Sequence, residues 1–149
     1  MKFAVDTDVL ACAEGVNGTE RHHAARQIIA RLPPGEGHIP APVLGELFAM
    51  LNRKAKRSAE ASREAAMFWR DTYRVLSVTE NAALLALDLV VAHGLSFAYA
   101  VVITTAADGG CRLLLSADLP QGFVWRGMTL VDPFAPIPHP LLVDALGPE

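Results

Sequence analysis

Short apolar runs alternate with longer segments in which apolar residues recur at helical spacing along most of the chain. The clearest helical segment spans about residues 42–55, whose apolar face consists of Val43, Leu44, Leu47, Met50 and Leu51. Further helices are predicted at residues 9–14, 20–32, 62–73, 80–93 and 97–108, and short strands at residues 3–6, 39–40, 74–78, 112–116 and 128–131. This alternation predicts an α/β fold with a central parallel sheet flanked by helices on both faces.

The length and composition indicate one globular domain. The 149 residues are 52% hydrophobic and 19% charged, which is enough apolar material for a core. No linker or repeat interrupts residues 1–134, and we expect the proline-rich stretch at residues 135–149 to pack on the surface as a tail. The most apolar segment, residues 82–92, carries Asp88 and is too short to span a bilayer, so no membrane association is expected.

Charge and cysteine content bear on the binding partners and the cellular location of the protein. The formal net charge of −3 argues against a protein that coats DNA, although a local basic patch on an acidic body can still bind nucleic acid. Cys12 and Cys111 lie far apart in the sequence, which favours a reducing, cytoplasmic location over a disulfide framework or a zinc site. No basic region followed by a long apolar stretch opens the chain, so no signal peptide is expected.

Acidic residues follow two of the predicted strands. Asp6 and Asp8 come directly after the apolar run at residues 3–5, and Asp118 follows the run Leu113-Leu114-Leu115. Ligands of open α/β folds bind beyond the carboxyl ends of the strands, where crowded carboxylates repel each other unless a cation joins them. A simpler interpretation is that Asp8 caps the next helix and Asp6 is a solvated strand end.

Glu46 adds a fourth acid on the otherwise apolar face of the predicted helix at residues 42–55. A carboxylate on such a face is costly unless its charge is compensated, although a single Glu often lies at the helix edge and reaches water. If Glu46 and the strand-end acids converge, a divalent cation would neutralise them. Mg²⁺ and Mn²⁺ prefer such oxygen ligands.

These residues resemble the motifs of a known family. The opening Val5-Asp6-Thr7-Asp8-Val9-Leu10 is similar to the first motif of PIN-domain nucleases, and Val43-Leu44-Gly45-Glu46-Leu47 is similar to the second. Three further segments resemble the later motifs of the family: Gly94-Leu95-Ser96-Phe97-Ala98-Tyr99-Ala100, Leu114-Leu115-Ser116-Ala117-Asp118-Leu119 and Met128-Thr129-Leu130-Val131-Asp132-Pro133-Phe134. These motifs occur in the family's order and at its spacing, and together they span most of the chain. The subgroup that the motifs resemble most is the bacterial VapC-type toxins.

The resemblance implies a Mg²⁺- or Mn²⁺-dependent endoribonuclease of toxin type that hydrolyses RNA phosphodiester bonds. In that chemistry a metal lowers the pKa of a bound water, and the resulting hydroxide attacks phosphorus in line. Asp6, Glu46 and Asp118 would be catalytic metal ligands, and Ser116 would orient a ligand or water beside them. The resemblance also implies a cognate antitoxin and a homodimer as partners.

Tyr99 departs from the family pattern, which normally has an Asp at this place in the third motif. A phenol is neutral at pH 7 and is a poor ligand for hard divalent cations. Asp8 is a second departure, and it adds an acid where Tyr99 removes one, because the family usually has Asn at this position. It would return a carboxylate to the cluster as an additional metal ligand.

A basic cluster, which comprises Arg53, Lys54, Lys56 and Arg57, follows the Glu46 helix. It begins about two helical turns, or about 10 Å, from Glu46, a suitable distance for holding RNA phosphates that lead into an acidic site. The alternative is that these basic side chains face water and only stabilise the helix, since positive charge is favourable at the negative, C-terminal end of the helix dipole.

Two other functions remain open from the sequence. The first is a PIN fold with a decayed metal site that binds RNA or protein without cleaving it; metal titration would separate it from a nuclease. The second is a phosphatase of the haloacid dehalogenase type, suggested by the Asp-x-Asp pair. Leu10 stands where that family would have Thr or Val, and no later Lys followed by an acidic pair is evident, so it is the weaker alternative.

Overall fold

The computed structural model describes residues 1–118 and 121–149. In these residues six strands form one sheet: β1 (Phe3–Val5), β2 (Gly37–Pro40), β3 (Arg74–Leu76), β4 (Leu113–Leu115), β5 (Val124–Trp125) and β6 (Met128–Val131). Their order across the sheet is β3-β2-β1-β4-β6-β5. All neighbours pair in parallel except β5, which pairs antiparallel with β6 at the edge. The predicted parallel sheet is therefore confirmed apart from this edge strand.

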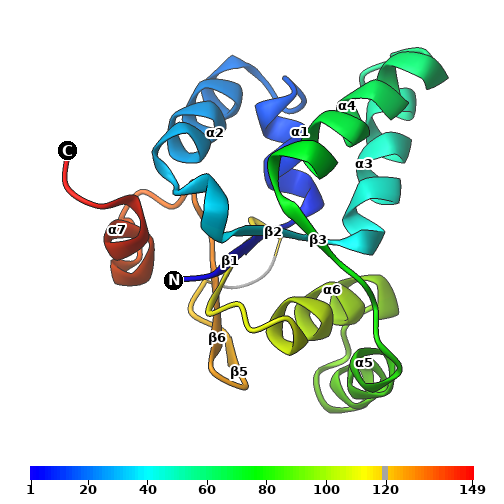
Figure 1. Ribbon diagram of the computed structural model, residues 1–149, viewed down its shortest axis with the longest axis vertical. Helices are drawn as coiled ribbons and strands as arrows, with labels where there is room; N and C mark the ends of the chain where they lie inside the picture. The colour runs from blue at the N-terminus through cyan, green and yellow to red at the C-terminus, as the bar shows by residue number, and fades with distance from the viewer. Residues whose placement is uncertain (119–120) are drawn as a thin grey trace.

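Seven α-helices of the described residues accompany the sheet: α1 (Thr7–Ala13), α2 (Thr19–Arg31), α3 (Ala41–Arg53), α4 (Ala59–Thr72), α5 (Glu80–His93), α6 (Phe97–Asp108) and α7 (Pro140–Leu146). Figure 1 shows α1 to α4 on one side of the strands β1 to β3, and α5 and α6 on the other. The α/β architecture with helices on both faces is thus confirmed. None of the described helices is long and apolar enough to cross a membrane.

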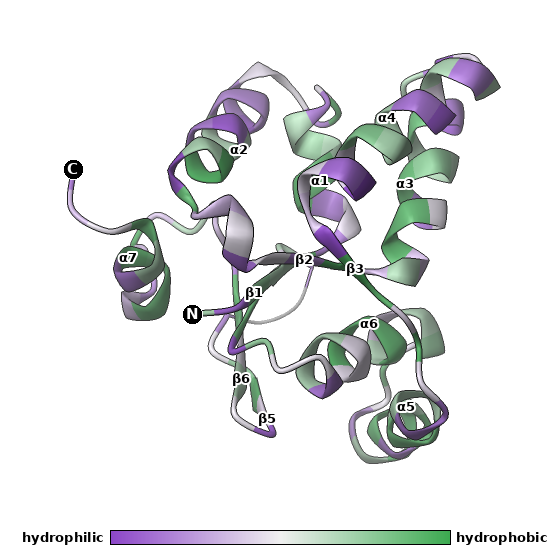
Figure 2. Ribbon diagram, in the orientation of Figure 1, coloured by the Kyte–Doolittle hydropathy of each residue, from purple (hydrophilic) through white to green (hydrophobic). Residues whose placement is uncertain are grey.

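Burial explains why the strands are short and continuously apolar. Every residue of β1 and β4 is buried, because helices cover both faces of these central strands. In α6 the seven consecutive residues 100–106 are buried, as expected for a helix that is apolar on all sides. The same helix is largely green in Figure 2, and α5 lies next to it.

Helix caps fix where several elements begin. Thr79 and Ser96 cap α5 and α6 through their side-chain oxygens, which accept hydrogen bonds from the backbone N–H groups of Ala82 and Tyr99. At the start of α1 the cap is Asp6, whose carboxylate accepts a hydrogen bond from the backbone N–H of Thr7. The simpler interpretation of the acidic pair is therefore wrong in both parts: Asp8 lies inside the first turn, and Asp6 is buried.

The C-terminal stretch contains a helix that its proline content conceals. His139 caps α7 with its ring nitrogen, and Pro140 takes the first helical position, where its missing N–H costs nothing. Leu142 on this helix is buried in the core. The division of the chain at residue 134 stays a prediction.

Candidate metal centre

The acidic residues lie where the direction of the sheet's strand order reverses. From the neighbouring strands β1 and β4 the order runs outward to β2 and β3 on one side and to β6 and β5 on the other. Open α/β sheets form a crevice at such a point, beyond the carboxyl ends of the strands. Asp6 directly follows β1, and the turn that carries Ser116 and Asp118 directly follows β4.

Donors of the protein itself hold Asp6 in place. Its Oδ1 accepts a hydrogen bond from the backbone N–H of Thr7 at 2.7 Å, and its Oδ2 accepts one from the hydroxyl of Ser116 at 2.9 Å. The side chain is buried, with 4% of its surface exposed. Ser116 also accepts a hydrogen bond from the backbone N–H of Asp118 at 3.4 Å, so one hydroxyl links the two acids.

Asp8 joins α1 to the turn after β4. Its Oδ1 accepts a hydrogen bond from the backbone N–H of Val9, and its Oδ2 accepts one from the backbone N–H of Ala117, both at 2.7 Å. The contact to Ala117 spans the whole domain in sequence and keeps the turn close to the first helix. Asp8 therefore has a structural role that its position in the sequence does not indicate.

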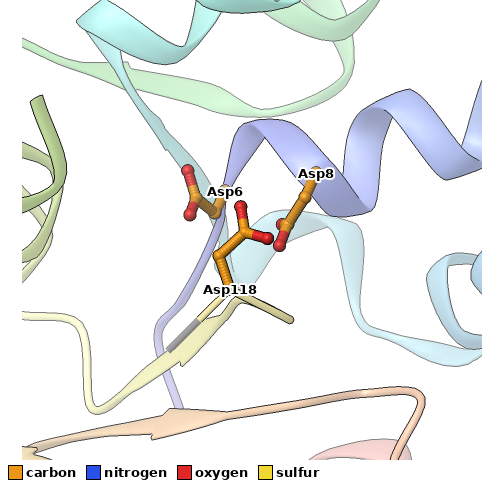
Figure 3. Close-up of side chains that lie close together, drawn as sticks. All are labelled: Asp6, Asp8 and Asp118. Atoms are coloured by element: carbon orange, nitrogen blue, oxygen red, sulfur yellow. The ribbon is translucent and has the colours of Figure 1, made fainter. Parts of the chain in front are cut away.

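Three carboxylates converge as a result. Each of Asp6, Asp8 and Asp118 offers an oxygen, and these atoms lie within 4.8 Å of one another. In Figure 3 the Asp118 side chain lies between the other two and points toward them. Asp118 is exposed, whereas Asp6 and Asp8 are buried.

The electrostatics of this cluster are unfavourable without a counter-charge. Burial, with smaller contributions from the charges of Glu46 and Asp118, raises the pKa of Asp6 to about 6. Burial and the charges of Asp6 and Asp118 raise the pKa of Asp8 to about 7. A bound cation would remove the repulsion that contributes to both shifts. The donor set, the spacing and the charge therefore fit a hard divalent cation.

Glu46 lies on the same pocket but is held separately. Its Oε2 accepts a hydrogen bond from the hydroxyl of Thr7 at 2.6 Å, which fixes the carboxylate against the start of α1. The pocket has a volume of about 220 Å³, and its lining consists of Asp6, Thr7, Asp8, Glu46, Met50, Ser96, Ala98, Tyr99, Val102 and Asp118. All four acids considered from the sequence thus share one pocket, and three of them share one cluster.

The family can now be assigned from comparison with known proteins. A family model described as the PIN domain matches residues 3–119. The chain belongs to the PIN domain family. The matched range ends before the motif at Met128–Phe134, so that part of the resemblance lies outside it, and Leu119 lies outside the described residues. No curated protein matches the chain at a significant level.

Solved structures of toxins and toxin–antitoxin complexes share this PIN fold. The Mycobacterium tuberculosis toxin VapC20, described as cleaving the sarcin-ricin loop, is 27% identical with a TM-score of 0.65, over 78% of this chain and 92% of that one. A toxin–antitoxin complex from Klebsiella pneumoniae has 16% identity and a TM-score of 0.68, over 89% and 98% of the two chains. The FitAcB structure from Neisseria gonorrhoeae has 14% identity and a TM-score of 0.63, over the same shares.

The four residues of the basic cluster of this PIN domain lie in three different surroundings. Arg53 and Lys54 line a groove of about 370 Å³ that also contains Glu46, so they continue the acidic pocket outward. Arg57 points elsewhere: its guanidinium pairs with the carboxylate of Glu14 at 3.2 Å and donates to the Glu14 backbone carbonyl. Lys56 is exposed on the loop between α3 and α4.

Two contacts that position acidic residues of the PIN domain were not predicted from the sequence. Thr7, which orients Glu46, received no role, although a hydroxyl residue between two acids is the signal that could have found it. The backbone N–H of Ala117, which holds Asp8, has no sequence signal, because any residue except proline supplies it.

Proposed function

We propose that this PIN domain is a toxin-type endoribonuclease that depends on Mg²⁺ or Mn²⁺. The observation that carries the proposal is the convergence of Asp6, Asp8 and Asp118 within 4.8 Å at the strand-end pocket of a PIN fold. Such a cation, when bound, supplies an activated water and stabilises the charge that develops on a phosphodiester.

The residues of the chain have separate roles in this proposal. Asp6 and Asp118 bind the cation, and Ser116 orients Asp6 through the 2.9 Å hydrogen bond to its Oδ2. Asp8 adds charge to the cluster while it holds the turn that carries Asp118. Glu46, oriented by Thr7, completes the acidic wall as a further ligand or as an acceptor for a proton of an attacking water.

RNA is the proposed substrate because the acidic pocket opens toward basic side chains. Arg53 and Lys54 share the adjoining groove with Glu46 and can pair with backbone phosphates on either side of the cleaved bond. Lys56 can extend this contact, whereas the pairing with Glu14 leaves Arg57 less free to do so. The similarity to the loop-cleaving toxin VapC20 supports RNA as the substrate class.

An antitoxin is the proposed partner, since solved relatives of similar fold include toxin–antitoxin complexes. A basic side chain of such a partner could neutralise the acidic cluster and so block the cation site. The homodimer and the cytoplasmic location stay predictions from the sequence.

Cleavage of RNA by the purified protein tests the proposal. The native chain with Mn²⁺ should cleave a mixed RNA substrate, and activity should be lost on chelation. Asp6→Asn should lower the rate by about 100-fold or more, because a ligand of the cation is removed. Asp88→Asn, an exposed acid on α5, is the matched control and should cleave as the native chain does. Equal cleavage by Asp6→Asn and the native chain would refute the assignment of the site.

A second candidate function is a PIN domain that binds RNA or protein without cleaving RNA. Tyr99 is the observation that favours it, because a neutral phenol lines the pocket where the family has an acid. An inert native chain and an active Tyr99→Asp variant would support this alternative. The family assignment leaves no support for the haloacid dehalogenase-type phosphatase.

A further inference from the structure

Tyr99 is fixed at the entrance of α6, facing the acidic pocket. Ser96 caps the helix, and its hydroxyl oxygen accepts a hydrogen bond from the backbone N–H of Tyr99 at 3.3 Å. Tyr99 is half-buried and lines the pocket that contains the acids. The cap thus fixes the backbone of Tyr99 in the first turn of α6, and its side chain lines the pocket.

The acidic residues of the pocket come from other elements than α6, the helix that carries Tyr99. Asp6, Asp8 and Asp118 form one cluster, and the Glu46 carboxylate is bound by the hydroxyl of Thr7. The lining on the side of α6 is neutral: it consists of the cap residue Ser96 and of Ala98, Tyr99 and Val102 in the helix. A second divalent cation would need carboxylate ligands from this side, and none of the described α6 residues in the lining supplies one.

Asp118 differs from its neighbours in how its carboxylate is held. Asp6 and Asp8 each receive two hydrogen bonds, one on each oxygen. No hydrogen bond to the Asp118 carboxylate forms among the described residues, but the Tyr99 side chain lines the same pocket and carries a hydroxyl that can donate. A phenol is neutral at pH 7, so the Tyr99 hydroxyl has a proton to donate to this carboxylate.

We propose that Tyr99 is a positioning residue that orients the Asp118 carboxylate and limits the site to one divalent cation. The proposal rests on the cation-dependent function given above and makes it more specific. It assigns Tyr99 two effects with separate origins. The hydroxyl can donate a hydrogen bond to Asp118, and the neutral ring occupies the position from which α6 would otherwise present a carboxylate.

Titration with Mn²⁺ followed by electron paramagnetic resonance of the free ion measures stoichiometry and affinity without any substrate. The native chain should bind one Mn²⁺. Tyr99→Phe, which removes only the hydroxyl, should still bind one ion but about 10-fold more weakly, as is typical when a group that orients a ligand is lost. Tyr99→Asp should bind two. Tyr73→Phe is the matched control, because Tyr73 packs in the core against Phe3 and should leave both values unchanged.

The outcomes separate this proposal from the function on which it rests. Two ions bound by the native chain, or an affinity of Tyr99→Phe within about twofold of native, would overturn the proposal while the cation-dependent function stands. One ion bound by Tyr99→Asp would also overturn the single-cation role of Tyr99. No binding by the native chain would overturn both. Thermal unfolding of each variant identifies any loss of affinity that comes from misfolding.

Discussion

Replacing Asp8 with asparagine should stabilise the cation-free protein at alkaline pH. The folded state raises the pKa of Asp8 from an ordinary 3.8 to about 7, chiefly by burial. Because the folded pKa exceeds the unfolded one, the associated stability is complete below about pH 4 and is lost as the pH rises to about 7. At about 1.4 kcal/mol per unit, the ionised carboxylate costs the folded state roughly 4 kcal/mol above that pH.

Asparagine removes this cost but also weakens the anchoring of the turn. One amide oxygen can replace only one of the two carboxylate oxygens that accept hydrogen bonds from the backbone N–H groups of Val9 and Ala117. The lost hydrogen bond costs about 1–3 kcal/mol at every pH. The test is therefore how the difference in unfolding free energy between Asp8→Asn and the native chain changes with pH. Relative to native, Asp8→Asn should gain about 3 kcal/mol of unfolding free energy between about pH 5 and pH 8.

Urea unfolding in a chelating buffer at several pH values measures this difference, and repetition with Mn²⁺ provides the second half of the test. The native chain should regain stability when Mn²⁺ is added at about pH 8, since binding to the folded state alone is stabilising. Asp8→Asn should regain less, because a carboxylate of the cluster is missing. The variant thus exchanges cation binding for stability.

Asp88→Asn is the control for general charge effects, and its pH dependence should match the native curve, because Asp88 is exposed on α5. A native pH dependence that persists unchanged in Asp8→Asn would refute the reasoning. In that case the stability change would have to come from other groups, and the buried acidic pair would not be the source.

Three further perturbations address other parts of the site and fold. Ser116→Ala removes the donor to Asp6 Oδ2, so the apparent pKa of Asp6 should rise further above about 6 and Mn²⁺ affinity should fall about 10-fold, measured by calorimetry. Lys54→Ala should raise KM for RNA with little change in kcat and should reduce the salt dependence of binding. Gly37→Ala should destabilise the fold by about 1–3 kcal/mol in urea unfolding, because a Cβ there would overlap the Tyr73 ring.

The sequence was most informative where burial imposes a pattern. Three-residue apolar strands followed by acids indicated both halves of the site, since strands covered on both faces must be continuously hydrophobic. Strand β5 escaped prediction because two residues show no periodicity. Helix α7 escaped because prolines precede it and Pro140 takes its first position, so that the stretch resembles a loop.

The exchange of roles between Asp6 and Asp8 could not be predicted from local sequence. Both residues suit a helix cap, and the choice depends on a partner far away in the chain. Asp8 is drawn toward the backbone N–H of Ala117, a contact that exists only once β1 and β4 are paired. The pairing of Arg57 with Glu14 is of the same kind, because charge runs by themselves do not specify their partners.

The pairing of β1 with β4 also has a consequence for synthesis of the chain. Asp6 leaves the ribosome early, but its hydrogen-bonding partner Ser116 follows 110 residues later. Although domains fold as units during translation, no nascent fragment that lacks β4 contains the complete acidic cluster. If the protein cleaves RNA, the order of its strands delays that activity until β4 and Asp118 have been made.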